Sequence, residues 1–273
     1  GELFAAGEKT GAHLLFEASV GAGIPLIRTL QTSLAPNKIN NLYGILNGTC
    51  NYILTAMEDE PGLEFDLVLK KAMELGYAEP DPTFDIEGID AAHKIAILGS
   101  LIFRRDLRID NVVTYGITRL APMDFQFAAE KNQSIKLLVR AHLDEEGTPR
   151  LSVWPTMVPL EHPIARVRGV TNTLYVDAEP IGPTMYTGPG AGQGSTGSGV
   201  ISDIMAIAQA MDSETLGHMN PIEIPPEGRF DTSATERHPR RYLRISGFGA
   251  DKAAKTLSYP VLSESEWGAI VVA

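Results

Sequence analysis

The sequence is poor in cysteine, in positive charge and in long apolar runs. Cys50 is the only cysteine among 273 residues, which excludes an internal disulfide or a thiolate metal cluster and predicts a reducing, cytoplasmic location. Lysine and arginine number 23 against 34 aspartates and glutamates, which gives a formal net charge of −11. So acidic a surface repels phosphate backbones and anionic lipids, and neither nucleic acid nor a membrane is an expected partner. The longest apolar stretch, near residues 95–103, is too short to cross a bilayer.

The remaining composition is typical of a folded globular protein. Hydrophobic residues make up 44% of the chain and charged residues 21%, and the length allows one large domain or two of ordinary size. Residues 1–15 begin in a helical pattern with no capping residue before it, so we expect them to continue from a longer chain.

Helical and strand-like patterns are mixed along the chain. Helical spacing is clearest over residues 64–75, which Gly76 can end, and a second helix is expected from 86 to about 103 with Asp85 as its cap. Strands are expected at residues 13–18, 40–46, 112–118, 134–142, 150–157, 173–176 and 242–245. This mixture predicts an α+β fold, a mixed sheet with helices on one face. Because residues 135–141 are apolar on both faces, we expect a second subunit to cover the other face, in a homodimer or a homotetramer.

The most informative stretch is GYAEPDPTFDIEGIDAAHK, residues 76–94, which holds five carboxylates and ends in a lysine. Asp90 and Lys94 are four residues apart and share one face of the expected helix. An exposed ion pair would account for them, but the apolar residues around much of this helix and the stiffness of Pro80 and Pro82 before it favour a partly buried site. A lysine among carboxylates can act as a general acid/base, and the carboxylates can hold an ammonium group. The pattern therefore suits an amino-acid substrate that carries an alcohol or an aldehyde.

Two further segments place glycines before a helix. Residues 17–24, EASVGAGI, lead through a glycine turn into a helix, and a structural role is the simpler interpretation. Residues 188–199 are glycine-rich and precede a helix over 200–211; glycines let the backbone approach a phosphate, although close helix packing explains them equally well. His93 has no second histidine or cysteine at ligand spacing, so no zinc site is expected, and Cys50 is interpreted as a small packing residue.

The pattern A-x3-G-Y-A-x2-D-P-x2-D-I-x-G-x-D-x3-K, from Ala72 to Lys94, closely resembles the signature of homoserine dehydrogenases. Three other stretches resemble the same family in the same order: FEASVGAGIPLIRTL at 16–30, GILNGTCNYILT at 44–55 and GPGAG at 188–192. The resemblance covers about residues 2–211. It implies an NAD- or NADP-dependent oxidoreductase that interconverts L-aspartate 4-semialdehyde and L-homoserine, in the biosynthesis of threonine, methionine and isoleucine.

The resemblance also implies a set of substrate-binding residues. The residue matching Lys94 is the proton donor to the carbonyl oxygen, and those matching Glu79 and Asp90 bind the amino group of homoserine. The residues that line the substrate pocket match Tyr77, Asp85 and Thr49. From the residues alone, a packed core tyrosine and a helix cap remain the alternatives for Tyr77 and Asp85.

Cofactor and cation contacts are implied in the same way. The positions that contact the dinucleotide match Gly76, Gly190 and Gly192. A monovalent cation such as sodium is held by oxygens, mostly backbone carbonyls, at the positions that match Glu17, Val20, Ala22 and Ile24. Hard cations prefer such oxygen ligands. Ser195 stands where the family pattern usually has proline.

The family resemblance divides the chain into four expected segments. They are the tail end of a Rossmann cofactor domain (1–15), a catalytic and dimerisation domain (16–185), a glycine-rich loop and helix that return to the cofactor domain (186–220), and a linker with a partial ACT-like regulatory segment (221–273). No strand–G-x-G-x-x-G–helix unit precedes Glu17. The alternative is therefore a catalytically incomplete module that binds an amino acid and dimerises.

Overall fold

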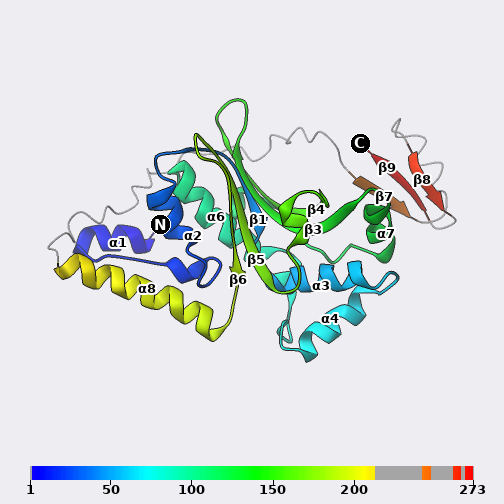
Figure 1. Cartoon of the computed structure of the whole chain (residues 1–273), viewed down its shortest axis with the longest axis horizontal. Coiled ribbons are helices and arrows are strands. Elements are labelled where there is room, and N and C mark those ends of the chain that lie inside the picture. The colour runs from blue at the N-terminus through cyan, green and yellow to red at the C-terminus, as the bar shows by residue number, and fades with distance from the viewer. Residues whose placement is uncertain (1, 213–241, 247–260, 266–267, 273) are drawn as a thin grey trace. The chain divides into compact units, whose positions relative to one another are not determined.

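The computed structural model describes residues 2–212, 242–246, 261–265 and 268–272 (Figure 1). The chain divides into two units, Gly1–Phe230 and Asp231–Ala273, each of which is described by itself. No helix within the described residues has both the length and the apolar character that a membrane span requires.

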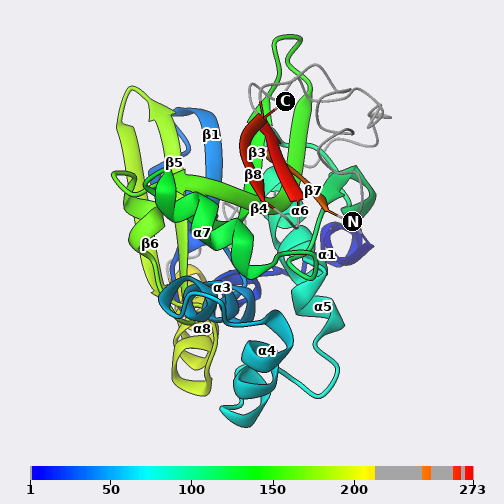
Figure 2. The ribbon, with the colours of Figure 1, turned by 90° about the vertical axis from the view of Figure 1, so that its right-hand side faces the viewer.

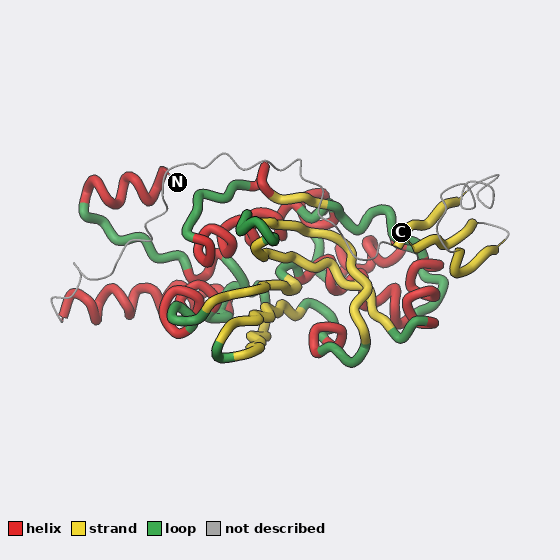
Figure 3. The backbone as a smooth tube through the Cα atoms, turned by 90° about the horizontal axis from the view of Figure 1, so that it is seen from above, coloured by secondary structure: helices red, strands yellow, loops and turns green. Residues whose placement is uncertain are grey.

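The first unit is built on a six-stranded mixed sheet. Its strands are β1 (Lys38–Ile45), β2 (Val112–Thr114), β3 (Gln133–Leu143), β4 (Pro149–Pro159), β5 (Thr171–Glu179) and β6 (Gly182–Pro189). They lie in the order β2-β4-β3-β1-β5-β6, and all neighbours are antiparallel except β2 and β4. Figure 3 shows these strands running through the middle of the unit with helices around them. The α+β fold and the mixed sheet expected from the sequence are therefore confirmed.

The helices of this unit lie before, between and after the strands in the chain. They are α1 (Glu2–Thr10), α2 (Leu26–Arg28), α3 (Gly48–Asp59), α4 (Phe65–Glu74), α5 (Thr83–Ile86), α6 (Ile89–Phe103), α7 (Pro122–Glu130) and α8 (Gln193–Asp212). Short helical turns are η1 (Glu17–Ser19), the π-helical η2 (Thr29–Ser33), η3 (Ile109–Asn111) and η4 (Pro163–Arg166). Figure 2 shows α3, α4 and α5 gathered at one end of the strands.

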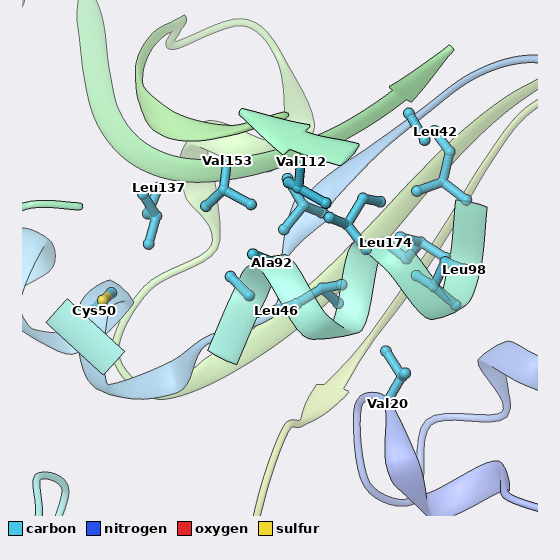
Figure 4. Close-up of a cluster of buried hydrophobic side chains, with 14 of the residues drawn as sticks. Val20, Leu42, Leu46, Cys50, Ala92, Leu98, Val112, Leu137, Val153 and Leu174 are labelled. Atoms are coloured by element: carbon cyan, nitrogen blue, oxygen red, sulfur yellow. The ribbon is translucent and has the colours of Figure 1, made fainter. Parts of the chain in front are cut away.

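The main core lies between one face of the sheet and helices α3 and α6. Alternate residues of β3 point into it and are at most 3% exposed: Ile135, Leu137, Val139 and Ala141. Figure 4 shows Leu137 and Val153 of the sheet on one side of this core and Ala92 and Leu98 of α6 on the other. Each fully buried aliphatic side chain stabilises the fold by roughly 1.5–3 kcal/mol. Because α6 is apolar around most of its circumference, burial holds it firmly beside the sheet.

The opposite face of the sheet is only partly covered. Ile164 and Val167, in and after η4, pack against Ile45. Around them lie half-buried aromatic and aliphatic side chains of the sheet, and Tyr43 stacks on Tyr175 with ring centroids 5.0 Å apart. Within the first unit, helices α3 and α6 thus cover one face of the sheet. The second subunit expected on the other face stays a prediction.

Several local expectations were wrong. Residues 13–18 do not form a strand: Glu17–Ser19 is a 3-10 turn, and the backbone N–H of Glu17 donates to Asp203 Oδ2 at 2.8 Å instead of to a neighbouring strand. The strand expected at 112–118 stops at Thr114, and β6 was not predicted. Helix α8 begins at Gln193 rather than near residue 200, so several glycines of the glycine-rich segment are helical.

Asp85 does not cap the long helix either. It lies inside the short helix α5, and Gly88 separates α5 from α6 with a left-handed φ of 79°. A left-handed residue interrupts a helix, and glycine adopts that conformation without strain. The single helix expected from residue 86 is therefore two helices with a break, and the Asp85 side chain is free for another role.

The second unit contains a three-stranded antiparallel sheet. Its strands are β7 (Tyr242–Ser246), β8 (Val261–Ser265) and β9 (Gly268–Val272), in the order β7-β9-β8. The strand expected at 242–245 is confirmed, but it pairs with β9 instead of standing alone. The linker expected after residue 220 lies outside the described residues.

Candidate active site

The candidate site forms where the end of β1, the start of α3 and the helices α5 and α6 meet. Helix α3 begins directly after Leu46 and Asn47, because the side-chain oxygen of Asn47 accepts a hydrogen bond from Cys50 N at 2.8 Å. An asparagine in this position satisfies a backbone donor that the first helical turn leaves unpaired. The cap therefore fixes the start of α3 beside the first turn of α6.

Lys94 is the central charge of this group. Its ammonium donates to Asp90 Oδ2 at 2.7 Å and to the backbone oxygen of Leu46 at 2.9 Å. The two side chains are 19% and 21% exposed, so the alternative of a fully solvated ion pair is wrong. An ammonium has three N–H donors, and no described residue accepts the third. Lys94 is thus held in place with one donor left for a ligand.

Asn47 links the two aspartates of the site. Its side-chain nitrogen donates to Asp85 Oδ1 at 2.7 Å and to Asp90 Oδ2 at 2.9 Å. The other oxygen of each carboxylate receives no hydrogen bond from the described residues, so each can accept one from a ligand. Asn47 was not among the site residues predicted from the sequence, although an asparagine between a strand and a helix is a recognisable capping signal.

Thr49 and Tyr77 lie next to this group. Thr49 Oγ1 donates to the backbone oxygen of Tyr77 at 2.6 Å and ties the first turn of α3 to the loop after α4. Tyr77 is 42% exposed, and its ring rests against Tyr52 with centroids 4.9 Å apart. The alternative of a packed core tyrosine is therefore wrong. Gly76 ends α4 with a φ of 74°, as its position predicted.

Glu79 does not join the other acidic residues. It lies exposed in the loop before α5, and within the described part of the chain it forms no hydrogen bond or ion pair with Asp90 or Lys94.

Cys50, in contrast, is buried in the first turn of α3, next to the site. Its Sγ donates to the backbone oxygen of Asp85 at 3.1 Å, and burial raises the pKa of this thiol well above its usual range. Cys50 thus serves as a neutral packing residue.

In the glycine-rich segment, one glycine is closely packed against a neighbouring side chain, and two others have open space around their Cα atoms. A Cβ at Gly190 would overlap the buried side chain of Asn172 at 2.0 Å, so only glycine fits there. Gly192 has a φ of 106° and Gly194 lies in the first turn of α8, and a Cβ at either would meet nothing within 4 Å. Helix α8 is long, and the free N–H groups at such a helix start attract anions. This backbone can therefore be approached by a phosphate group.

The segment 17–24 contains a buried carboxylate and several backbone carbonyls of buried residues. The carboxylate of Glu17, 4% exposed, accepts backbone hydrogen bonds from Ile27 at 2.8 Å and Arg28 at 2.9 Å, and burial raises the pKa of this carboxyl. Val20 and Ala22 are also buried, and no described residue donates a hydrogen bond to their carbonyl oxygens. The carbonyl oxygen of Ile24 accepts one from Leu26 N at 2.7 Å. Buried carbonyls without donors fit the ligand preference of a small hard cation.

Helix α8 is fastened to this segment at two points. Ser195 Oγ accepts from Gly23 N at 3.0 Å and donates to the backbone oxygen of Pro189 at 3.1 Å. Further along α8, Asp203 accepts from the backbone of Glu17 and pairs with Arg28 at 3.1 Å. The serine that stands in place of the family's usual proline thus forms a bridge that proline could not form.

Comparison with known proteins gives a consistent result. The family model described as homoserine dehydrogenase matches residues 25–205. The chain is 42% identical over 238 residues to the homoserine dehydrogenase of Pseudomonas aeruginosa, an alignment that covers 87% of this chain and 53% of that protein. The chain spans about half the length of the curated relatives it matches.

Two solved structures extend the similarity to the fold. A homoserine dehydrogenase from Thiobacillus denitrificans superposes with a TM-score of 0.86 at 36% identity, covering 99% of this chain and 65% of that one. A hyperthermophilic archaeal homoserine dehydrogenase in complex with NADPH superposes with a TM-score of 0.64 at 28% identity, covering 76% and 59%.

Proposed function

Because the chain belongs to the homoserine dehydrogenase family, we propose that it forms the substrate-binding and catalytic part of an enzyme that interconverts L-aspartate 4-semialdehyde and L-homoserine. The observation that carries this proposal is the Lys94 ammonium, which two protein acceptors hold in place while its third donor stays open. Such an enzyme acts in the biosynthesis of threonine, methionine and isoleucine, and a cytoplasmic location agrees with the single buried cysteine.

Lys94 is the general acid/base of the proposed reaction. During reduction of the aldehyde, negative charge develops on the carbonyl oxygen, and the open N–H of Lys94 stabilises this charge and delivers the proton. During oxidation of homoserine, the step runs in reverse: the neutral amine that proton delivery leaves on Lys94 takes the proton from the hydroxyl group. Asp90 and the backbone oxygen of Leu46 keep the nitrogen aligned in both directions.

The carboxylates of the site bind the substrate ammonium. Asp85 and Asp90 each keep one oxygen without a hydrogen bond from the described residues. Glu79, which lies exposed in the neighbouring loop, would complete the ammonium site, and Thr49 and Tyr77 would line the pocket beside it. A carboxylate accepts a short, charge-assisted hydrogen bond from an ammonium group.

The open backbone of the glycine-rich segment fits a dinucleotide. Gly192 and Gly194 have free space above their Cα atoms, and Gly76 and Gly190 would lie along the same ligand. A bound NAD or NADP would supply or accept the hydride at the substrate carbon. The similar archaeal enzyme in complex with NADPH supports a nicotinamide cofactor.

The segment 17–24 would hold a monovalent cation, with sodium as the proposed ion. The buried carbonyls of Val20 and Ala22 that receive no hydrogen bond from described residues support this assignment. Glu17 and Ile24 would complete the oxygen ligands. The ion would place a positive charge beside α8 and would take no part in proton transfer.

Two larger features belong to the same proposal. Helix α8 exposes an apolar stripe made of Val200, Ile201, Ile204 and Met205, which suits packing against a Rossmann cofactor domain of which residues 1–15 are the tail.

The half-covered face of the sheet suits a homodimer, and the three-stranded second unit suits an ACT-like regulatory segment. Tyr43→Asp should reduce the particle mass measured by analytical ultracentrifugation from dimer to monomer.

The test of the catalytic role compares Lys94→Ala with the wild type in homoserine oxidation, followed by NADPH absorbance. Loss of a positioned acid/base should lower kcat by roughly 100- to 10,000-fold, while calorimetry should show nearly unchanged homoserine binding. Lys70→Ala, at an exposed position on α4, is the matched control and should leave kcat unchanged. A normal kcat in Lys94→Ala would refute the assignment.

The test of the ammonium site uses Glu79→Gln and Asp90→Asn, which keep shape and remove charge. Each should raise the KM for homoserine about 10-fold or more, since a hydrogen bond to a charged group contributes ~1.5–3 kcal/mol. Glu74→Gln, exposed at the end of α4, is the control. Homoserine binding without any NADPH binding in the wild type would instead favour the catalytically incomplete binding module.

A further inference from the structure

Asn47 is the side chain that joins every part of the candidate site. It is 5% exposed, and all of its side-chain polar atoms are used. The oxygen caps α3 through Cys50 N, while the nitrogen donates to Asp85 Oδ1 at 2.7 Å and Asp90 Oδ2 at 2.9 Å. One neutral amide therefore connects a helix start to two acidic side chains of two other helices.

The orientation of this amide follows from its partners. With the amide reversed, the oxygen would face two carboxylates and the nitrogen would face the N–H of Cys50. Both contacts would then be repulsive, because carboxylates only accept hydrogen bonds and backbone nitrogens only donate them. The cap on α3 thus holds the two donors toward Asp85 and Asp90.

Asp85 and Asp90 both accept a hydrogen bond from the Asn47 side-chain nitrogen, so this nitrogen lies between two acidic side chains. Two like charges in a half-buried site repel each other, and a carboxylate pair commonly relieves that repulsion by sharing a proton. Lys94 contacts Asp90 but forms no ion pair with Asp85. Among the described residues, the titratable groups hydrogen-bonded to Asn47 or to these two aspartates are Lys94 and Cys50, and the amide donates one hydrogen bond to each carboxylate.

We propose that Asn47 is a positioning residue that keeps Asp85 and Asp90 aligned for the substrate ammonium and for Lys94. This inference rests on the proposed function, in which both carboxylates face an amino-acid substrate. Asn47 itself touches no reacting atom. Its effect reaches the substrate through the two aspartates, so it should appear in substrate affinity and in the pH dependence of that affinity.

The test variant is Asn47→Asp in the whole protein. Aspartate has nearly the same size and is as good a helix cap, so the start of α3 is kept while both donors are replaced by a third carboxylate. Homoserine Kd is measured by calorimetry across the acidic and neutral pH range, in parallel with kcat/KM. Asn47→Ser also keeps a capping side chain but removes the bridge without adding charge. It is the second variant if Asn47→Asp does not fold.

If Asn47 were only the N-cap of α3, its replacement would not change how homoserine binding depends on pH. A change in that pH dependence is therefore the expected result. In Asn47→Asp the acid limb of homoserine binding should move up by about one pH unit or more, because the crowded carboxylates take up a proton. In Asn47→Ser the Kd should rise roughly 10-fold near neutral pH. A wild-type pH profile and Kd in both variants overturns the role of Asn47 while leaving the proposed function intact. A wild type that neither binds nor oxidises homoserine overturns both.

Discussion

Replacement of Lys136 by methionine should stabilise the protein. Lys136 lies in β3 and is 0% exposed, and its ammonium forms no hydrogen bond with the part of the chain that the structure describes. Among the described residues, it forms an ion pair with Glu58 at 3.8 Å and with no other side chain. At an effective dielectric constant of about 20, this attraction is worth roughly 4 kcal/mol, whereas burial of an ion costs several kcal/mol. Burial lowers the pKa of Lys136 despite Glu58, so the cost of burial exceeds the attraction.

Glu58 does not depend on Lys136. It accepts a hydrogen bond from Ser134 Oγ at 2.8 Å and pairs with Arg168 at 3.7 Å. Lys136→Met therefore leaves no unpaired buried charge, and the free energy of unfolding should rise by about 1–3 kcal/mol. Lys94→Met removes two short hydrogen bonds and should instead lower it by about 1–3 kcal/mol.

Urea denaturation followed by circular dichroism measures both changes. The gain in Lys136→Met should also depend on pH. The folded-state pKa of Lys136 is depressed, so the stability of its neutral form is fully present above the ordinary value of 10.5 and is lost as pH falls through the folded pKa. The difference between variant and wild type should therefore shrink toward high pH. A loss of more than about 1 kcal/mol at neutral pH would show that the reasoning is wrong.

Three further predictions concern other positions. Gly190→Ala should lower the free energy of unfolding by about 1–3 kcal/mol, measured by urea denaturation, because its Cβ would overlap Asn172. Burial lowers the pKa of His162 below 6.5, so the stability that depends on its neutral form is present above pH 6.5 and is lost as pH falls through the folded pKa. The melting temperature of the wild type should therefore fall in acid, and that of His162→Phe should fall less. Cys50 is buried as a neutral thiol, so iodoacetamide should label it only as fast as the protein unfolds, and rapid labelling of the native protein would contradict its burial.

The sequence allowed the local part of the site to be predicted, because local spacing fixes it. Asp90 and Lys94 are one helical turn apart, so their pairing follows from any helix that contains both. The bridge from Asn47 to Asp85 and Asp90 spans 38 and 43 residues and depends on how α3 packs against α5 and α6. No spacing rule contains that information.

The failures of prediction have similar tertiary causes. Residues 13–18 look like an apolar strand, but Glu17 lies in a turn whose backbone N–H donates a hydrogen bond to Asp203, 186 residues away. The glycines at the start of α8 disfavour a helix by propensity. They form one nevertheless, and Gly199 is small enough to pack against the carbonyl oxygen of Ala22, which a Cβ would meet at 2.7 Å. The break at Gly88 did have a local signal, since a glycine inside a helical pattern is a possible interruption.

The double attachment of α8 has a thermodynamic consequence. A helix held at one point can swing or rotate about that point, but Ser195 and Asp203 hold α8 at two. We therefore expect the helix and segment 17–28 to move together, so that ordering of either by a ligand would reduce the conformational entropy that a second ligand must remove from the other. Linkage would make this effect reciprocal for the two ligands of the proposed function: the factor by which the proposed cation tightens the proposed nucleotide would equal the factor by which the nucleotide tightens the cation.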